Sequence, residues 1–520
     1  MTTIPVLSSN QAAAWDRRAE SQGIPLAVLM ECAGRAAAAV LAVRFSDRLR
    51  HGVLVAAGPG NNGGDGWVIA RALHAAGVPV WVTTPTLQSG ELTRAQALLA
   101  REAGVRDVAS DGPWPNTGLV VDALLGTGAT GAPRGAVAAL LPRLAELETP
   151  IVGIDGPSGL GLDDGVQQGP LRAALSITFG GYRRGHLQAR DDVGDLVVVD
   201  IGLPPPEPAW PVLFTESAAA MHLAPFPADS HKGTRGRVIV VGGDDGMLGA
   251  ARLAARAAFA AGAGLVHLVA PAGSVTVASS AEPDLQTCAQ PFEAMPSGRT
   301  VALLAQGDAV VIGPGLGRKA SRPDFIIAAI AAVSSNAVLV LDADALVAFA
   351  GQVERLRAAL AGRSAILTPH AGEFRGLFPE AASLVDVDPW GAAEAAAARV
   401  GATVLLKGVP TVIATPGRSP LTVAAGNPGL ATGGSGDTLS GLIAAMAASG
   451  DDHVLAAATA AVALGEGADL AARRSSARSM RPMDVLAALP DIWRHWDLVR
   501  RMPVPARPPI LHELSAPARV

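Results

Sequence analysis

Short, continuously apolar segments alternate with alanine-rich segments of helix length along almost all of this 520-residue chain. In the first part of the chain the apolar segments are residues 52–57, 78–83, 119–125, 150–154, 175–179 and 196–201. They recur later at residues 237–241, 265–269, 309–312, 337–341, 365–367 and 403–406. Strands that are apolar on both faces, each followed by a helix, are typical of a mostly parallel sheet covered on both sides. The pattern therefore predicts an α/β fold.

The alternation is interrupted by the segment GLPPPEP at residues 202–208. Neither a helix interior nor a sheet tolerates so many prolines, so this segment predicts a stiff linker or hinge. We therefore expect two α/β domains, residues 1–215 and 220–500, which do not share their glycine-rich motifs. The proline-rich end of the chain, residues 501–520, predicts a disordered tail.

The composition argues against several classes of protein. With 49% hydrophobic and 17% charged residues, the sequence is typical of a soluble globular protein. A net charge of −5 and 4% aromatic residues argue against a nucleic-acid partner. Cys32 and Cys288 are too few and too far apart for a disulfide framework or a zinc site. The charge-free stretch 257–281 is divided by glycine and proline into lengths too short to span a bilayer.

The first glycine-rich motif, GPGNNGGDG at residues 58–66, follows a predicted strand and precedes a predicted helix at residues 67–76. Its glycines permit positive φ angles and close backbone approach, and the helix N-terminus offers free amides to an anion. An ordinary strand-to-helix turn is the alternative. The two asparagines and the aspartate among the glycines favour a polar ligand.

Two further strand ends carry aspartate followed by glycine, Asp122 in DALLGTG and Asp155 in IDGPSG. Ligands of open α/β sheets bind beyond the carboxyl ends of the strands. A single aspartate there is more often a helix cap. Three such ends bearing the oxygen donors Asn62, Asp122 and Ser158 favour a cation site beside an anionic ligand.

These motifs, together with LSSxQxxxxD at residues 7–16 and LMECAGR at residues 29–35, resemble the NAD(P)H-hydrate epimerase family over most of residues 1–215. The resemblance implies a Rossmann-like three-layer domain that interconverts the R and S epimers of NAD(P)HX, the hydrated reduced nicotinamide cofactor. It implies potassium at Asn62, Asp122 and Ser158. It also implies that the substrate contacts Asn61, Asn62, Gly63, Gly64, Asp65, Gly126, Thr127, Gly128, Ala129, Thr130, Gly131, Ala132 and Asp155.

The sequence departs from that family at two positions. Ala174 stands where an aspartate is usual, and Arg183 stands where a lysine is usual. Arginine keeps the positive charge but transfers protons poorly, because its pKa is too high. A weakened epimerase, or a first domain that only binds a dinucleotide, is therefore an alternative.

In the second domain, Asp437 lies in the motif GGSGDT at residues 433–438, directly before an apolar helix. The glycines allow backbone amides to converge on a phosphoryl group at the helix N-terminus. Asp437 is either a helix cap or the base that takes a proton from an attacking hydroxyl, and the surrounding glycines and serine favour the base.

This loop resembles the ribokinase-like superfamily, and further motifs between residues 229 and 445 resemble its ADP-dependent NAD(P)H-hydrate dehydratases. They include HKG at 231–233, IGPGLG at 312–317, LDADAL at 341–346, LTPH at 367–370 with Glu373, and LKG at 406–408. The resemblance implies Asp437 as the catalytic base and Mg²⁺ at the nucleotide. It implies ADP contacts at Lys407, Gly408, Val409, Pro410, Thr411 and Gly436, and substrate contacts at Ala250, Gly317, His370 and Asp437.

His370 in isolation is equally consistent with a structural surface histidine. Asp342 and Asp344 are interpreted mainly as strand-end and capping residues, with a metal-binding role as the alternative. The hypothesis is a bifunctional enzyme, an isomerase fused to a lyase, that repairs both epimers. The alternative is a ribokinase-like small-molecule kinase with a non-catalytic N-terminal module. We expect a cytoplasmic homo-oligomer with no membrane or nucleic-acid partner. No residue separates ADP from ATP, or NADH from NADPH.

Overall fold

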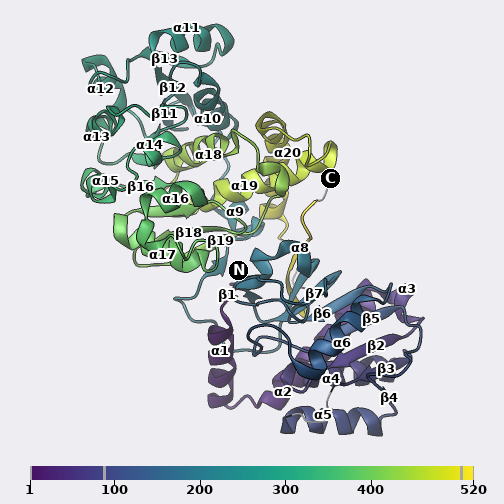
Figure 1. Cartoon of the computed structure of the whole chain (residues 1–520). Coiled ribbons are helices and arrows are strands. Elements are labelled where there is room, and N and C mark those ends of the chain that lie inside the picture. Colours follow the sequence, from purple (N-terminus) through teal and green to yellow (C-terminus); the bar gives the residue numbers. More distant parts are fainter. Residues whose placement is uncertain (1–2, 86–89, 504–506, 519–520) are drawn as a thin grey trace. The chain divides into compact units, whose positions relative to one another are not determined.

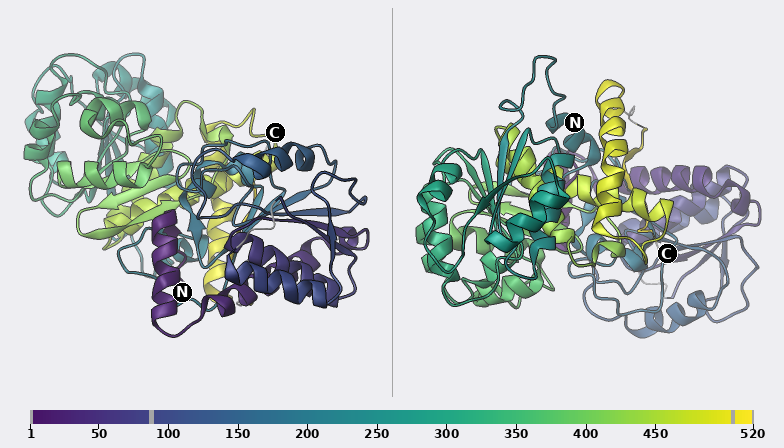
Figure 2. Two further views of the ribbon diagram at one scale, coloured as in Figure 1. Left: turned by 60° about the horizontal axis from the view of Figure 1, so that its bottom comes forward. Right: turned by 90° about the horizontal axis from the view of Figure 1, so that it is seen from above.

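The computed structural model describes residues 3–85, 90–503 and 507–518. It contains two compact units, the first formed by Met1–Trp210 with Pro505–Ala516 and the second by Pro211–Val504 with Pro517–Val520. Helices cover both faces of the sheet in each unit (Figures 1 and 2). The predicted α/β class with parallel sheets is confirmed.

The first unit has an eight-stranded sheet in which all neighbours are parallel except the pair β20–β9. In spatial order its strands are β20 (Ile510–Leu514), β9 (Asp195–Val199), β7 (Leu175–Phe179), β6 (Ile151–Ile154), β5 (Leu119–Ala123), β2 (Val53–Ala57), β3 (Val80–Thr83) and β4 (Arg106–Val108). A separate parallel pair is formed by β1 (Val6–Leu7) and β8 (Tyr182–Arg183). The helices are α1 (Ser9–Ser21), α2 (Leu26–Arg44), α3 (Ser46–Leu49), α4 (Asn61–Ala75), α5 (Glu91–Glu102), α6 (Gly135–Ala145), α7 (Arg184–Gln188) and α8 (Arg190–Val193).

Alternate residues of β2 belong to two different cores, as a three-layer fold requires. Val53 and Val55 pack in a cluster that includes apolar residues of α2 and α4. Leu54 packs in a second cluster with apolar residues of α6. Because successive strand residues point to opposite faces, a continuously apolar strand is the sequence signature of a sheet covered on both sides.

The end of the chain corrects the prediction of a disordered tail. Residues 510–514 form β20, which pairs antiparallel with β9 at the edge of the first unit's sheet. The segment lies far along the sequence from its partner strand, so no local pattern identifies it. Residues 504–506 and 519–520 of the predicted tail lie outside the described residues.

The proline-rich segment also differs from a free hinge. The indole nitrogen of Trp15 in α1 donates a hydrogen bond of 2.8 Å to the carbonyl of Pro204. Trp210 packs edge-on against the same indole, with ring centroids 5.4 Å apart. The linker is therefore held against α1 as part of the first unit, and the second unit begins with β10 (Val212–Leu213), which the sequence prediction had placed in the first domain.

The second unit has a ten-stranded sheet whose neighbours are parallel except in the pairs β17–β18 and β18–β19. In spatial order its strands are β10, β19 (Arg418–Val423), β18 (Thr411–Thr415), β17 (Thr403–Leu406), β16 (Ala365–Leu367), β15 (Val338–Leu341), β14 (Ala309–Ile312), β11 (Arg237–Val241), β12 (Leu265–Ala270) and β13 (Gln286–Ala289). Its helices are α9 (Glu216–His222), α10 (Leu248–Ala260), α11 (Ala272–Ala281), α12 (Gly298–Leu304), α13 (Arg322–Ala332), α14 (Asp344–Val347), α15 (Val353–Leu360), α16 (Ala371–Leu377), α17 (Pro389–Val400), α18 (Ser435–Ser449), α19 (His453–Arg474) and α20 (Pro482–Arg501).

Small residues allow the helices of this unit to pack closely. A Cβ at Gly441 in α18 would lie 2.1 Å from the carbonyl oxygen of Ala254 in α10, so only glycine fits this crossing. Among the described residues, α2 and α19 are long and apolar enough to span a bilayer, but 50% and 78% of their apolar windows are buried in the protein. Both helices contribute many buried residues to the cores of their units.

Candidate functional sites

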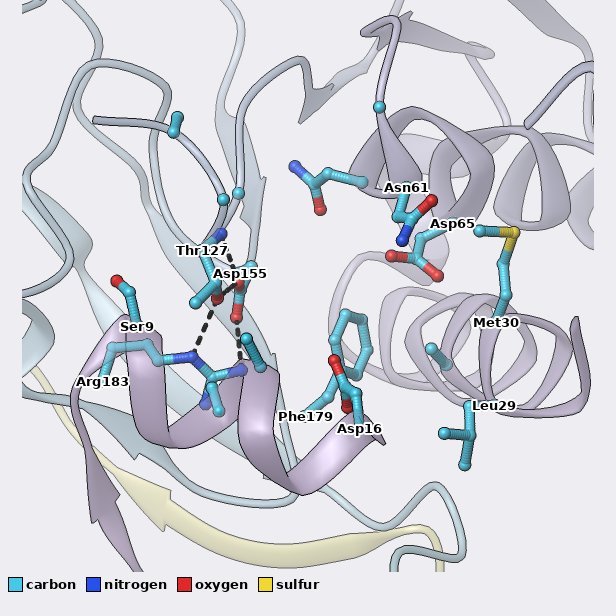
Figure 3. Close-up of a pocket in the computed structure, with 18 of the residues that line it drawn as sticks. Ser9, Asp16, Leu29, Met30, Asn61, Asp65, Thr127, Asp155, Phe179 and Arg183 are labelled. Carbon is cyan, nitrogen blue, oxygen red and sulfur yellow. Dashed lines mark hydrogen bonds and ion pairs between the residues drawn. The ribbon is translucent and has the colours of Figure 1, made fainter. Parts of the chain in front are cut away.

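A cavity of about 620 Å³ opens at the carboxyl ends of the parallel strands of the first unit (Figure 3). Its walls come from α1, α2, the N-terminus of α4 and the loops that follow β5 and β6. Of the predicted substrate-contacting residues it is lined by Asn61, Asn62, Asp65, Gly126, Thr127, Gly128, Ala129, Thr130 and Asp155. The position matches the expected ligand site of an open α/β sheet.

The glycine-rich motif proves to be part of a helix. Helix α4 begins at Asn61, six residues before the predicted start, and Gly60 is its N-cap. Asn61 and Asp65 are four residues apart, so they lie on the same helix face, and both line the cavity. None of the motif's glycines has a positive φ, which corrects that part of the prediction.

The glycines instead permit close packing. A Cβ at Gly63 would lie 1.9 Å from the carbonyl oxygen of Gly58, and one at Gly64 would meet the end of Met30 at 2.5 Å. These two glycines are buried beneath the cavity and do not line it. Two other predicted residues also lie outside its lining, since Gly131 borders a smaller cavity of about 20 Å³ and Ala132 is exposed.

Asp155 is the most constrained side chain at this site. It follows β6 with a φ of 63°, which is uncommon for a residue other than glycine. One carboxylate oxygen accepts a 2.9 Å hydrogen bond from the Thr127 amide, and the other accepts one of 2.9 Å from the Thr178 hydroxyl. Burial on its own would raise the pKa of Asp155, but Arg183 and these hydrogen bonds lower it, so the carboxylate is charged at neutral pH.

Arg183 lies in the cavity wall and is 6% exposed. Its guanidinium lies 3.3 Å from a carboxylate oxygen of Asp155. The Nε donates to the Thr127 hydroxyl at 2.9 Å and one Nη donates to the Gly181 carbonyl at 3.0 Å. The planar guanidinium therefore holds a fixed positive charge and connects Thr127 and Asp155 to the backbone at Gly181.

The other sequence departure, Ala174, is remote from this site. Ala174 is exposed and directly precedes β7, whereas Arg183 follows that strand, so Ala174 lies at the amino end of the sheet. The cavity lies at the carboxyl ends of the parallel strands. Loss of the usual aspartate at residue 174 therefore leaves the cavity wall unchanged.

The structure adds Asp16 of α1 to the cavity, although the sequence reasoning quoted it only as part of a motif. Asp16 and Asp65 both face the cavity (Figure 3). Desolvation raises the pKa of Asp16. The positive charge of Arg183 lowers this pKa, and the negative charge of Asp155 raises it further. Burial and the charges of Asp155 and Asp16 raise the pKa of Asp65 well above its ordinary value.

Of the three residues expected to hold a cation, Asp122 and Ser158 contact each other, and Asn62 contacts the end of β6. Asp122 is fully buried, and its two oxygens accept hydrogen bonds of 2.6 Å from the Ser158 amide and hydroxyl. The Asn62 side-chain amide donates to the Ile154 carbonyl at 3.1 Å. Burial raises the pKa of Asp122 to about 6, and no ion pair within the described ranges neutralises it. A buried carboxylate among oxygen donors fits a hard cation.

In the second unit Asp437 lies in the first turn of α18, whose N-cap is Gly434 with a φ of 97°. The Lys407 ammonium lies 2.9 Å from one oxygen of Asp342, and a Cβ at Gly436 would lie 3.1 Å from that ammonium. Lys407 directly follows β17, and Gly408–Pro410 lead to Thr411 in β18. The first turn of α18, which carries Asp437, and the predicted ADP-binding residues 407–411 therefore meet at Lys407.

The charges at this site are strongly coupled. Burial and the negative charge of Asp342 raise the pKa of Asp437 to about 6, against the opposing effect of Lys407. Burial alone would lower the pKa of Lys407, but the carboxylates of Asp342, Glu373 and Asp437 raise it. Lys407 therefore stays charged, and Asp437 titrates close to neutrality, as a general base requires.

Asp342 and Glu373 were not predicted as site residues, and the structure places both against Lys407. Asp342 is 1% exposed and its second oxygen is buried without a hydrogen-bond partner. Glu373 is 8% exposed and lies 3.7 Å from the Lys407 ammonium. The LDADAL and LTPH motifs carried the signal, but spacing alone did not show that they converge on one lysine.

The remaining predicted residues have mainly structural contacts. The His370 Nδ1 accepts hydrogen bonds from the amides of Gly372 and Glu373 and so caps α16, which supports the structural interpretation of its ring. The amide of Gly317 donates to Asp344 at 2.9 Å, and Ala250 lies in the first turn of α10. In the part of the chain that the structure describes, neither Ala250 nor Gly317 hydrogen-bonds to the group around Lys407.

Together these features define a two-unit α/β protein. One unit has a carboxylate-lined cavity at the carboxyl ends of its strands, where open α/β sheets bind ligands, and the other has Asp437 in the first turn of α18 beside the Lys407–Asp342 pair. Comparison with known proteins identifies the family. A family described as NAD(P)H-hydrate dehydratase matches residues 238–491, and one described as YjeF-related protein N-terminus matches residues 26–185.

Relatives from all domains of life match across both units. The bifunctional NAD(P)H-hydrate repair enzyme of Escherichia coli K12 is 34% identical over 487 residues, covering 91% of this chain and 90% of that protein. Enzymes of the same description from Pyrobaculum aerophilum and Leishmania braziliensis are 35% and 34% identical, covering 96% and 93% of those proteins and 92% of this chain. The chain belongs to the family of bifunctional NAD(P)H-hydrate repair enzymes.

A solved structure of similar fold is the ADP/ATP-dependent NAD(P)H-hydrate dehydratase of Bacillus subtilis, co-crystallised with ATP and Mg²⁺. It is 27% identical with a TM-score of 0.47, covering 55% of this chain and 98% of that chain. A yeast protein, YNL200c, is 26% identical with a TM-score of 0.36, covering 43% of this chain and 96% of that chain.

Proposed function

We propose that this chain repairs the hydrated nicotinamide cofactors NADHX and NADPHX with two activities. The first unit interconverts the R and S epimers, and the second unit dehydrates the S epimer to NAD(P)H at the expense of ADP. Support comes from the two sites on one chain, from the NAD(P)H-hydrate dehydratase family that matches residues 238–491, and from relatives named bifunctional NAD(P)H-hydrate repair enzymes.

The observation that carries the proposal is Asp437, half-buried in the first turn of α18 beside the charged Lys407. In the proposed reaction the oxygen of the substrate hydroxyl forms a bond to the β-phosphorus of ADP, and Asp437 takes the proton of that hydroxyl. The bond from that phosphorus to the bridging oxygen breaks, and AMP leaves. Phosphate then leaves the substrate ring with its C–O electron pair, a proton is lost from the adjacent carbon, and NAD(P)H results.

The chain's own groups stabilise the transferring phosphoryl group. The free amides at the N-terminus of α18 and the Lys407 ammonium both favour negative charge there. The unpartnered oxygen of Asp342 fits a cation at this site. We propose that Mg²⁺ is held here mainly by nucleotide phosphates, and that when bound it neutralises their charge.

In the first unit the proposal assigns binding to the cavity wall. Its volume of about 620 Å³ lies within the usual range of small-ligand sites. The backbone of residues 126–130 and the side chain of Asn61 would contact the dinucleotide, and the Asp155–Arg183 pair would orient its nicotinamide end.

We also propose that Asn62, Asp122 and Ser158 bind potassium. Potassium should then raise the unfolding temperature of the wild-type first unit in the full chain, because it neutralises the buried Asp122. The Asp122→Asn variant should show no such rise. Equal stabilisation of both proteins by potassium would contradict this site.

The test of the activities is the recovery of NADH absorbance from a mixture of both NADHX epimers with ADP, Mg²⁺ and K⁺. Two phases are expected, with the second faster than spontaneous epimerisation and the total recovery complete. Recovery of only the S portion would leave the first unit without an epimerase role. A stable phosphorylated product without NADH would instead indicate a small-molecule kinase, and parallel assays with ATP test the nucleotide preference.

A further inference from the structure

The last strand of the chain makes a contact that the proposed reactions do not use. Strand β20 packs at the edge of the first unit's sheet, and its His512 contacts Tyr182 of β8. The two residues are 330 positions apart in sequence, and the Tyr182 hydroxyl lies 2.7 Å from the His512 Nδ1. Their rings are also in edge-to-face contact, with centroids 5.9 Å apart.

Tyr182 directly precedes Arg183, the fixed cation of the cavity. The two residues form all of β8, and successive strand residues point to opposite faces. Tyr182 is fully buried and bonded to β20, whereas Arg183 points to Asp155 and Thr127 in the cavity wall. Figure 3 shows the yellow C-terminal strand on the side of this segment away from the cavity.

So short a strand has few backbone bonds to fix its rotation. It pairs with the equally short β1, through Val6 and Leu7, and the Arg183 amide donates to the His186 Nδ1 at 3.1 Å. The side chain of Tyr182 is therefore a further anchor of β8, and a buried hydroxyl that loses its partner is destabilising unless it moves to find another. Rotation of β8 would carry the Arg183 guanidinium away from Thr127.

We propose that His512 is a positioning residue of the epimerase site: by holding Tyr182, the last strand of the chain sets the direction of Arg183 in the cavity. The epimerase site is thus assembled from both ends of the chain. The effect on catalysis rests on the epimerase activity proposed above, whereas the effect on Arg183 does not.

Three single variants of the full chain test the proposal. His512→Leu removes the polar partner and should lower the epimerase kcat about 10- to 100-fold, as expected when a reacting group is misplaced, with KM within about twofold. His512→Gln keeps a polar partner and should restore most of the rate. Ser515→Ala is the matched control, because the Ser515 side chain is exposed and its hydrogen bond to Arg190 uses the backbone carbonyl, so the rate should be unchanged.

The dehydratase rate with the S epimer, measured on the same samples, should be unchanged in all three variants, since β20 belongs to the first unit. A double-mutant cycle with Arg183→Met separates positioning from loss of stability. If His512 acts through Arg183, His512→Leu should have little further effect on kcat in the Arg183→Met background. Additive losses, or a wild-type epimerase rate in His512→Leu, would overturn the proposal.

A crystal structure of His512→Leu distinguishes this proposal from the proposed function. The hydrogen bond from Arg183 to the Thr127 hydroxyl, 2.9 Å in the wild-type protein, should be broken. An intact bond would overturn the proposal whether or not the protein epimerises NADHX. A wild-type protein without epimerase activity would contradict the proposed function alone.

Discussion

At the scale of single residues, two aspartates of this protein have pKa values that are shifted in opposite directions. Asp155 directly follows β6 and Asp437 lies in the first turn of α18, both beside a glycine, yet the pKa of Asp155 is lowered and that of Asp437 is raised to about 6. Asp155 has an arginine and hydroxyl donors against its carboxylate, whereas Asp437 faces further carboxylates. The neighbours, and not the residue type, decide which aspartate orients and which one accepts a proton.

Replacing the base should abolish dehydration. Asp437→Asn is expected to lower the dehydratase kcat by about 10²–10⁴, because the hydroxyl loses its proton acceptor. Interconversion of the epimers, followed by chromatography, should be unaffected. The Asp452→Asn variant makes the same exchange at a helix N-cap elsewhere in the second unit, where asparagine also caps, and serves as the matched control. A D437N enzyme with wild-type turnover would remove Asp437 from the mechanism.

The pH profile should report the coupling between Asp342 and Asp437. Only the ionised Asp437 accepts a proton, so kcat should rise with pH through about 6, the raised pKa of this residue. The negative charge of Asp342 contributes to the raised pKa of Asp437. Asp342→Asn should therefore lower the pKa of Asp437 and move the acid limb of the kcat profile to lower pH, by about one unit. An unmoved limb, measured under saturating substrate, would show that another group controls it.

At the scale of elements, the glycines of residues 58–66 set the distance between α4 and the sheet. Gly63→Ala is expected to destabilise the first unit by about 3 kcal/mol or more, because its Cβ would overlap the Gly58 carbonyl and the backbone would have to move. Gly60→Ala is the matched control. A Cβ there meets nothing within 4 Å, and loss of the glycine N-cap costs about 1 kcal/mol or less.

Urea unfolding of both variants, followed by a signal of the first unit, measures the difference. Comparable stabilities for the two variants would show that α4 can shift away from β2 at little cost. The glycines would then need another explanation, such as direct contact with the ligand.

At the scale of the whole molecule, each unit encloses its own core and its own site. Two full-length variants that are each defective in one unit should therefore complement one another in solution. A mixture of Asp437→Asn and Arg183→Met proteins is expected to recover NADH from both epimers, because the substrate diffuses between molecules. Recovery of only the S portion from the mixture would show that both sites must be on the same chain.

Several features of this protein follow from the sequence alone. Strand positions, the two-domain organisation and the loops that carry the chemistry depend on local patterns: apolar runs, glycine-rich turns and aspartates at strand ends. Twelve expected strands match elements of the structure because burial on both sides of a sheet requires continuous apolar residues. Asp122 and Ser158, predicted with Asn62 as one site, are hydrogen-bonded to each other, and Asn62 is bonded to Ile154 at the end of β6.

Other features were decided only by the tertiary structure. The start of α4 at Asn61 depends on packing against the sheet, since the motif's glycines favour a turn by local propensity. Asp342 joins the phosphate site through Lys407, 65 residues away, and β20 joins the first unit from the far end of the chain. Contacts between residues so distant in sequence leave no periodic signal, and they also set the charge of each site aspartate, because desolvation and neighbouring charges exist only once the chain is folded.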